Sequence, residues 1–215
     1  TQNGGYGQVN NVGIRIASAP YIAIMNPDIR LNKPIFAEMI KCLEQKNVAM
    51  CAGKQYGGNG TPFASFMTTF TTPWWIGRPL EFICRRILDT YIYKLQFLSG
   101  AFFAIRKDVM TEIGMFDENI FMYAEENDLH YRIRHKYPQL KMIYRKDLSY
   151  IHLAENRPFS TTQAKRVYES IGYFFKKNNL SCVNYWKGQI RLNRFLMCVY
   201  YISGLLHIGH RDKKL

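Results

Sequence analysis

Short apolar runs alternate with amphipathic stretches in the first part of the chain. Residues 21–25 are continuously apolar and end at an Asn-Pro-Asp turn, which predicts a buried strand. Residues 31–45 carry apolar side chains at helical spacing, and residues 48–52 form a second apolar run. This strand–helix–strand order is typical of an α/β fold with parallel strands.

The alternation of strands and helices continues along the chain. We expect strands within residues 102–105, 140–144 and 148–151, and helices over 107–113, 125–136 and 160–178. Three prolines interrupt the aromatic-rich residues 61–95, which predicts an irregular segment followed by a helix near 79–93. This segment either covers a substrate site or packs into the core.

The C-terminal part differs in character. Residues 195–208 are almost wholly apolar, and basic side chains flank them on both sides. Such a helix is shorter than the ~20 residues needed to span a bilayer. It lies in a membrane interface, or it docks on the domain or on a second subunit of a homo-oligomer. We therefore expect an α/β domain over residues 1–155 and a helical region over 156–215, with 191–215 as the candidate membrane contact.

Composition and charge limit the classes of partner. The 215 residues include 29 Lys and Arg against 16 Asp and Glu, a net charge of +13. Such a surface attracts nucleic acid, anionic lipid or phosphorylated substrates. Nucleic-acid binding predicts basic residues clustered with exposed aromatic residues. Here the basic residues are spread along the chain, and their strongest cluster flanks the apolar C-terminal stretch, so nucleic acid is not an expected partner.

The cysteines and the start of the chain bear on the cellular setting. Five scattered cysteines, none in a C-x-x-C pair, argue against a disulfide framework and a structural zinc site. They fit a reducing environment, and because the given residues show no signal-peptide pattern we expect a cytoplasmic protein. The chain begins at Thr1 inside a motif, so we expect that an N-terminal part of the natural protein precedes it.

The densest group of acids lies between residues 116 and 129, where a loop enters a predicted helix. The helix dipole favours acids in a first turn, and Asp128 can pair with Arg132 one turn on, so a structural role explains the pattern. The alternative is a catalytic role. Glu125 and Glu126 are adjacent and point in different directions, so one can anchor a site while the other serves as a general base whose pKa is raised by its neighbour.

Two further residues are candidates for a metal site. Asp28 follows a predicted parallel strand, at the edge where open α/β sheets bind ligands. A carboxylate there either holds Mg²⁺ or Mn²⁺ with substrate phosphates, or merely caps the next helix. His152 follows an apolar strand. It is a metal or phosphate ligand only if its loop lies beside Asp28, and is structural otherwise.

Four motifs occur in a defined order, at residues 3–14, 26–28, 99–103 and 114–129. In the same order, they are similar to four motifs of one enzyme family: an Asn-x-Gly-aromatic-Gly segment, an Asn-Pro-Asp acidic motif, a Gly-Ala acceptor-side strand, and a Gly-Gly-Phe-Asp-Glu block ending in Asp-x-Asp-Leu. This ordered set resembles the inverting GT-A glycosyltransferases of family 2, especially the rhamnosyltransferase-like bacterial branch. The resemblance implies a GT-A-like (Rossmann-like), mostly parallel sheet flanked by helices, with a C-terminal helical extension.

The resemblance also implies roles for single residues. Asp28 and His152 would hold a divalent metal, Mg²⁺ or Mn²⁺, on the diphosphate of the donor. Glu126 stands where the family has its catalytic Asp, and Glu125 where it has the preceding Glu. Substrate contacts are implied for the other motif residues and for Asp28 itself, which together are Asn3, Gly5, Asn11, Asp28, Ser99, Gly100, Ala101, Tyr123 and Asp128.

Two residues depart from the family's pattern. Glu126 replaces the usual Asp, which leaves the base open between Glu125 and Glu126, and Met115 replaces a usual Gly. The family's first strand–helix–strand unit, which binds the nucleotide base and ribose, is absent from this sequence, so we expect an incomplete donor site.

The implied function is transfer of a sugar, with inversion, from a nucleotide-sugar to a hydroxyl of a saccharide or lipid-linked acceptor. We expect it in bacterial cell-surface polysaccharide synthesis, at the inner face of the plasma membrane. The alternative is a truncated, non-catalytic module that acts in complex assembly.

Overall fold

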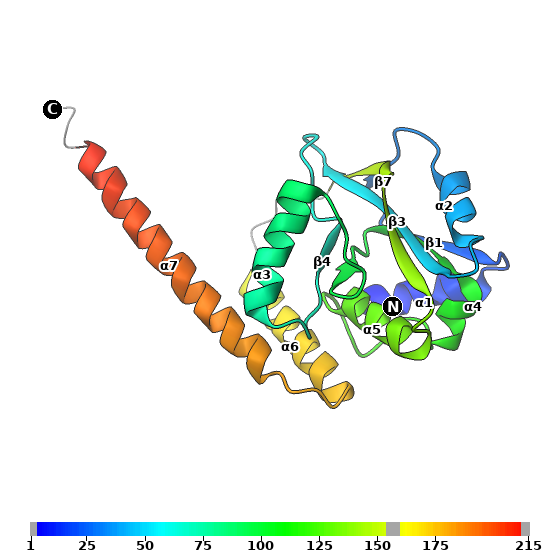
Figure 1. Cartoon of the computed structure of the whole chain (residues 1–215). Coiled ribbons are helices and arrows are strands. Elements are labelled where there is room, and N and C mark those ends of the chain that lie inside the picture. The colour runs from blue at the N-terminus through cyan, green and yellow to red at the C-terminus, as the bar shows by residue number, and fades with distance from the viewer. Residues whose placement is uncertain (1–3, 154–159, 212–215) are drawn as a thin grey trace.

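A five-stranded mixed sheet forms the centre of the protein (Figure 1). The computed structural model describes residues 4–153 and 160–211. The strands follow the order β1-β6-β3-β7-β2 across the sheet. Their bounds are Tyr21–Met25 for β1, Ile29–Arg30 for β2, Val48–Gly57 for β3, Phe102–Arg106 for β6 and Lys141–His152 for β7.

The directions of the strands differ from the expected mostly parallel pairing. β1, β3 and β7 run in the same direction, but β6 lies between β1 and β3 and is antiparallel to both. β2 is antiparallel to β7, so β3 and β7 form the one parallel pair of this sheet in the described part of the chain. Continuous apolar runs indicate strands buried on both faces, but they do not indicate the direction of the neighbouring strand. The α/β class is confirmed.

Helices cover both faces of the sheet. Side chains alternate between the two faces along a strand, and β6 shows this clearly. Phe102 and Ala104 pack with α2 (Phe36–Leu43) on one face, whereas Phe103 and Ile105 pack on the other. The helices of that second face are α1 (Gly5–Ile16), α4 (Lys107–Glu112) and α5 (Glu125–Lys136).

Two C-terminal helices follow the sheet. α6 (Thr161–Lys177) begins with a capping box in which Ser160 and Gln163 exchange hydrogen bonds. α6 contributes Phe174 to a third apolar cluster, against which Phe70 and Tyr185 pack. α7 (Val183–Arg211) then extends away from the sheet as one long helix (Figure 1). Among the described residues, no helix has the length and apolar character needed to cross a membrane.

Most predicted elements are present with altered bounds. The helices expected over 107–113, 125–136 and 160–178 are confirmed as α4, α5 and α6. The two strands expected at 140–144 and 148–151 form the single strand β7. α1 was not predicted, because four glycines in residues 4–13 obscure its helical pattern.

The aromatic-rich segment is more ordered than expected. It contains β4 (Phe66–Thr68), α3 (Trp74–Phe82), the π-helix η1 (Ile83–Leu88) and β5 (Gln96–Leu98). β4 and β5 pair as a small separate sheet. The helix begins before the predicted residue 79, because Pro79 lies within α3 and does not start it.

Candidate active site

Asp28 and His152 lie side by side at the edge of the sheet. β2 pairs with the end of β7, which places Ile29 opposite His152. The Asp28 carbonyl accepts a hydrogen bond from the Leu153 N–H at 2.9 Å. His152 Nε2 is 3.2 Å from Asp28 Oδ1, and the Asp28 side chain is 44% exposed. The sequence predicts His152 as a ligand only if its loop lies beside Asp28, and the structure meets this condition.

Gln55 contacts the other ring nitrogen of His152 and was not predicted from the sequence. Its Nε2 lies 3.0 Å from His152 Nδ1, and its Oε1 accepts hydrogen bonds from Tyr150 Oη at 3.0 Å and Ser99 Oγ at 3.2 Å. The side chain is buried in β3. The sequence gives no signal for this residue, because Gln55 stands between Lys54 and Tyr56, beyond the apolar run at 48–52, and only the structure shows that it is buried and bonded.

The Ser99-Gly100-Ala101 turn connects the Asp28–His152 pair to the acids of α5. Ser99 Oγ accepts the Ala101 N–H at 3.3 Å, and the Ala101 carbonyl accepts the Asn26 N–H at 2.9 Å. The turn is thereby fixed to the segment that carries Asp28. These contacts assign Ser99 and Ala101 to the support of the site.

Gly100 brings Glu126 to the other side of this turn. The Gly100 N–H donates to Glu126 Oε1 at 3.1 Å. A Cβ atom on residue 100 would lie 2.5 Å from Glu126 Oε1, a distance that real side chains do not tolerate. Only glycine allows this approach, so the Gly-Ala motif has a direct physical reason. A hydrogen-bonded line therefore runs from Asp28 through His152, Gln55 and the turn to Glu126, as the contacts above establish.

The two adjacent acids have different environments. Glu125 is 4% exposed, and its Oε2 accepts the Ala124 N–H at 2.8 Å, so it anchors the start of α5. Burial raises the pKa of Glu125. Burial, followed by the charge of Glu125, raises the pKa of Glu126 to about 8. The geometry therefore favours Glu126 as the base.

His130 holds the backbone beneath Glu126. Its Nδ1 lies 2.8 Å from the Glu126 carbonyl, and its Nε2 accepts the Leu98 N–H at 3.0 Å. Burial, with the nearby Arg134 charge, lowers the pKa of His130 to about 3, so the ring is neutral with Nδ1 protonated. His130 was missed because its partner Leu98 is remote in sequence.

Tyr6 fixes the same turn from the opposite side. Its hydroxyl donates to the Gly100 carbonyl at 2.6 Å, and its ring packs edge-on against Phe116. Burial and the charges of Glu126 and Glu125 raise the pKa of Tyr6, so the phenol stays protonated and remains a donor. Tyr6 belongs to a motif that the sequence singled out, but its role depends on a contact with a distant turn.

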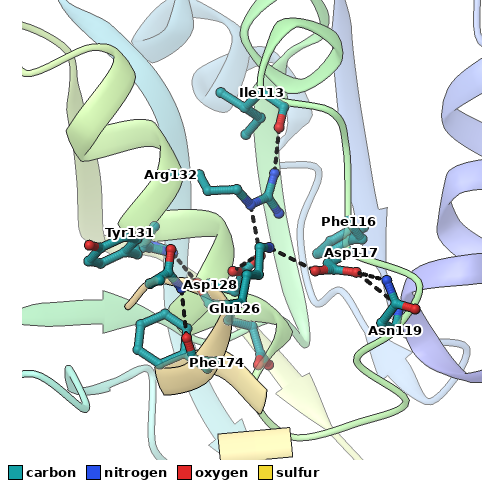
Figure 2. A network of polar contacts seen from close by, with 12 residues as sticks. Ile113, Phe116, Asp117, Asn119, Glu126, Asp128, Tyr131, Arg132 and Phe174 are labelled. Atoms are coloured by element: carbon teal, nitrogen blue, oxygen red, sulfur yellow. Dashed lines mark hydrogen bonds and ion pairs between the residues drawn. The ribbon is translucent and has the colours of Figure 1, made fainter. Parts of the chain in front are cut away.

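Asp128 does not reach this site. Figure 2 shows it within a polar network that includes Arg132 and Asp117. Asp128 is fully buried, with its two oxygens bound to Arg132 Nε at 2.7 Å and Lys177 Nζ at 2.8 Å. The alternative pairing of Asp128 with Arg132 is therefore confirmed, whereas the substrate contact expected for Asp128 stays a prediction. Lys177 also contacts Asp117 Oδ2 at 2.8 Å.

Asn11 is also absent from the site. Its Nδ2 donates to the Phe116 carbonyl and to Glu118 Oε1, and its Oδ1 accepts the Phe116 N–H, all within 3.0 Å. These bonds fasten α1 to the loop before α5. Asn11 is buried and its amide is occupied by these bonds, and the substrate contact expected for it stays a prediction.

The remaining motif residues shape the surroundings. Gly5 has a φ of +84°, and a Cβ there would lie 2.3 Å from the Phe121 carbonyl oxygen, so glycine lets α1 approach this loop. Tyr123 has a φ of +83°, and its hydroxyl accepts a hydrogen bond from Gln163 Nε2 at 3.4 Å. Asn3 lies outside the described residues.

Solved structures with a similar fold support the GT-A-like expectation. The chain is similar to glucosyl-3-phosphoglycerate synthase from Mycobacterium tuberculosis, in complex with Mn²⁺, UDP and phosphoglyceric acid, at a TM-score of 0.53 and 14% identity. The match covers 82% of this chain and 55% of that one.

Two further structures show the same likeness. The mannosyltransferase PcManGT from Pyrobaculum calidifontis, with GDP-Man and Mn²⁺, has a TM-score of 0.52 at 11% identity, over 94% of this chain and 60% of that one. GalNAc-T7 with UDP, GalNAc and Mn²⁺ has a TM-score of 0.52 at 13% identity, over 80% of this chain and 36% of that one.

The chain thus spans 36% to 60% of the length of these three proteins. At such identities the likeness concerns the fold, and it confirms the GT-A-like architecture. Comparison with curated proteins gives no match. The family model for glycosyl transferase family 2 matches residues 1–114, which is more than half of the 215 residues. The chain therefore belongs to glycosyl transferase family 2.

Proposed function

We propose that this protein transfers a sugar from a nucleotide-sugar donor to a hydroxyl group of an acceptor. The observation that carries the proposal is the hydrogen-bonded line that joins the Asp28–His152 pair to Glu126 through Gln55 and the turn at Gly100. The Asp28–His152 pair and the Glu126 carboxyl group of raised pKa lie on either side of this turn, and this arrangement supports the proposal. Membership of glycosyl transferase family 2 supports the same activity.

A divalent metal fits the Asp28–His152 pair. A carboxylate oxygen and an imidazole nitrogen are suitable ligands for Mn²⁺, and the half-exposed Asp28 side chain is accessible. No three His, Cys, Asp or Glu side chains gather as a metal site among the described residues, so oxygens of the donor diphosphate would complete the coordination. Mn²⁺ in the three similar structures supports Mn²⁺ or Mg²⁺ as the cofactor. A bound ion supplies positive charge that stabilises the leaving diphosphate.

Glu126 serves as the base in this proposal. Its Oε1 is held by the Gly100 N–H, and Oε2 takes the proton of the acceptor hydroxyl. The acceptor oxygen then forms a bond to the anomeric carbon while the bond from that carbon to the diphosphate breaks. Attack from the side opposite the diphosphate inverts the anomeric centre. A carboxylate with a pKa of about 8 is a stronger base than an ordinary glutamate.

The cellular setting follows from the family resemblance and from α7. Within the described part of α7, residues 195–199 are exposed and apolar, and Arg191 and Arg194 precede them. We propose that residues 191–215 rest on the inner face of the plasma membrane, where a lipid-linked or saccharide acceptor of surface polysaccharide synthesis is available. The rhamnosyltransferase-like branch stays a prediction.

The direct test is turnover of UDP-, dTDP- and GDP-sugars with Mn²⁺, measured as release of the nucleoside diphosphate. We expect turnover with one nucleotide class and a loss of roughly 10²-fold or more in Glu126→Gln. The control is Glu44→Gln, which changes an exposed carboxyl group next to α2. Equal rates in Glu126→Gln and the wild type would place the base elsewhere. Nucleotide binding without any turnover would favour the non-catalytic module.

A further inference from the structure

One face of the continuous helix formed by α3 and η1 exposes large apolar side chains. Trp75, Phe82 and Ile87 are 62%, 61% and 64% exposed. Ile76, Pro79 and Ile83 are exposed as well, and these six positions recur at helical spacing, so they share one face. A helix of a globular domain normally directs such a face to the core. An exposed apolar face of this kind marks an interaction site.

The opposite face of the same helix is packed in the ordinary way. Gly77 and Cys84 are buried, and Leu80 packs against the main core. Glu81 also turns inward, where it accepts hydrogen bonds from Arg85 at 2.6 Å and from the Thr68 N–H at 3.4 Å. The helix therefore packs through this face, and its outer apolar face makes no part of the described core.

The charges around this face are complementary to an anionic surface. Residues 74–88 contain three arginines, at positions 78, 85 and 86, and a single acid, Glu81, which is engaged by Arg85. Arg85 and Arg86 also line a cavity of about 160 Å³ together with Lys54 and Asp89. An apolar face with a basic margin and a tryptophan is the pattern of helices that lie in a membrane interface.

α7 continues this surface. The Arg191 guanidinium lies 5.7 Å from the centre of the Trp74 ring, and Arg78 Nη2 donates to Gln189 Oε1 at 3.3 Å. Beyond this contact α7 carries its own exposed apolar side chains, including Phe195, and it projects from the body of the protein (Figure 1). The two exposed apolar surfaces therefore belong to helices that touch.

We propose that the outer face of α3 and η1, defined by Trp75, Ile76, Pro79, Phe82, Ile83 and Ile87, is a membrane-docking surface. These side chains enter the acyl region of an anionic bilayer while the exposed Arg78 and Arg86 bind lipid phosphates. This contact is separate from the one proposed for residues 191–215. It does not depend on glycosyl transfer, because lipid binding is measured without any substrate.

The test is sedimentation of the full chain with vesicles of phosphatidylcholine, with and without phosphatidylglycerol. We expect binding that requires phosphatidylglycerol, and at least roughly a tenfold loss of binding in the triple variant Trp75→Ser, Phe82→Ser, Ile87→Ser. All three residues are exposed, so thermal unfolding should show that the variant stays folded.

A matched control removes three exposed apolar side chains elsewhere. Val9, Val12 and Ile16 of α1 are also largely exposed, and their replacement by serine should leave vesicle binding unchanged. Wild-type binding in the α3–η1 triple variant, or equal losses in both triple variants, would overturn the proposal. A third variant with Phe195→Ser and Met197→Ser tests α7. If it alone lost binding, the α3–η1 surface would be excluded while the contact of residues 191–215 would stand.

A second readout reports which residue enters the lipid. Bromine-labelled acyl chains should quench the tryptophan fluorescence of the wild type, and Trp75→Phe should remove most of the quenching without abolishing sedimentation. Trp186→Phe, which changes a side chain packed on Tyr168 and Tyr185, should retain it. If the wild type were instead a dimer that the α3–η1 triple variant separates, with vesicle binding unchanged, a second copy of the chain would cover this face.

Discussion

At the scale of single residues, Glu126 owes its chemistry to neighbours that are distant in the chain. The Gly100 N–H holds one of its oxygens, and the His130 ring holds its backbone carbonyl. Burial and the adjacent Glu125 raise its pKa to about 8. An ordinary surface glutamate would lose its proton near pH 4.5, so the folded protein holds this proton far more tightly than the unfolded chain does.

This difference predicts a pH-dependent effect of Glu126→Gln on stability. The contribution of the protonated group is complete below about pH 4.5 and is lost as the pH rises to about 8. Glutamine keeps a neutral side chain at every pH. The variant should therefore match the wild type near pH 4.5 and exceed its free energy of unfolding by roughly 1–3 kcal/mol near pH 8.5. Urea unfolding at both pH values measures this, with Glu44→Gln as the control. The same difference at both pH values would contradict the raised pKa.

Gln55 gives a second prediction at this scale. A metal on His152 Nε2 requires the ring proton on Nδ1, so the facing group of Gln55 must then accept a hydrogen bond. Rotation of the amide supplies Oε1 to Nδ1, and it turns the NH₂ group to Ser99 and Tyr150, whose hydroxyls can accept. Gln55 thus serves the ring in either tautomer.

Replacement of Gln55 by leucine should weaken Mn²⁺ binding by roughly 10- to 100-fold. Gln55→Glu keeps an acceptor facing Nδ1 and should retain most of the affinity. Electron paramagnetic resonance of free Mn²⁺, in the presence of each nucleoside diphosphate, measures the affinity without any turnover. Equal affinities of the Leu variant and the wild type would show that Gln55 does not orient His152.

The sequence alone predicted part of this site. It predicts that His152 can act with Asp28 only if the two lie side by side, and the pairing of β2 with β7 brings them together. The structural bonds of Asp128 and Asn11 could not be told from a ligand role by sequence, because an acid or amide near a helix start fits both equally well. Gln55 and His130 were missed because the partners of a buried polar group depend on tertiary contacts between remote segments.

At the scale of elements, Lys177 fastens α6 to the acidic loop. Its Nζ contacts Asp117 and Asp128 at 2.8 Å each, and both acids are largely buried. Burial by itself would raise the pKa of Asp117, but hydrogen bonds from Lys177 and Asn119 lower it to about 2. One lysine on α6 therefore bridges two acids of the cluster that follows residue 116, and Arg132 supplies a second positive charge to Asp128.

Lys177→Ala should accordingly lower the free energy of unfolding by roughly 1–3 kcal/mol, because it leaves buried carboxylates with fewer partners. Lys176→Ala, at the exposed neighbouring position of the same helix, should change stability by less than about 0.5 kcal/mol. Urea unfolding compares the two variants. Similar effects at both positions would mean that this pair of contacts does not hold α6.

Element prediction succeeded where one local pattern dominates. Helices α4, α5 and α6 have clear periodicity and clear stops, such as Pro138 after α5. The direction of β6 was not predictable, because it depends on how the chain returns through residues 61–98 rather than on the strand itself. For the aromatic-rich residues of α3 and η1 the sequence predicts either a cover over a substrate site or core packing. Periodicity alone does not show which side of a helix faces the core.

At the scale of the whole molecule, the candidate site and the proposed membrane contacts lie on different elements. The site links segments from α1, β3, β7 and α5, whereas the proposed membrane contacts belong to α3, η1 and α7. The family match covers residues 1–114, and Glu126 lies beyond it. The proposal of Glu126 as the base therefore rests on the motif resemblance at residues 114–129 and on the different contacts of Glu125 and Glu126, not on the family-model match.

The most direct test of the central claim is thermal unfolding of the chain with UDP, dTDP and GDP, each with and without Mn²⁺. A nucleotide at 100 times its dissociation constant should stabilise the protein by about 2.7 kcal/mol. We predict a Mn²⁺-dependent rise in Tm for one nucleotide that is lost in Asp28→Ala and kept in Asp147→Ala, which removes an exposed aspartate of β7. No rise with any nucleotide, or a rise that survives Asp28→Ala, would contradict the account.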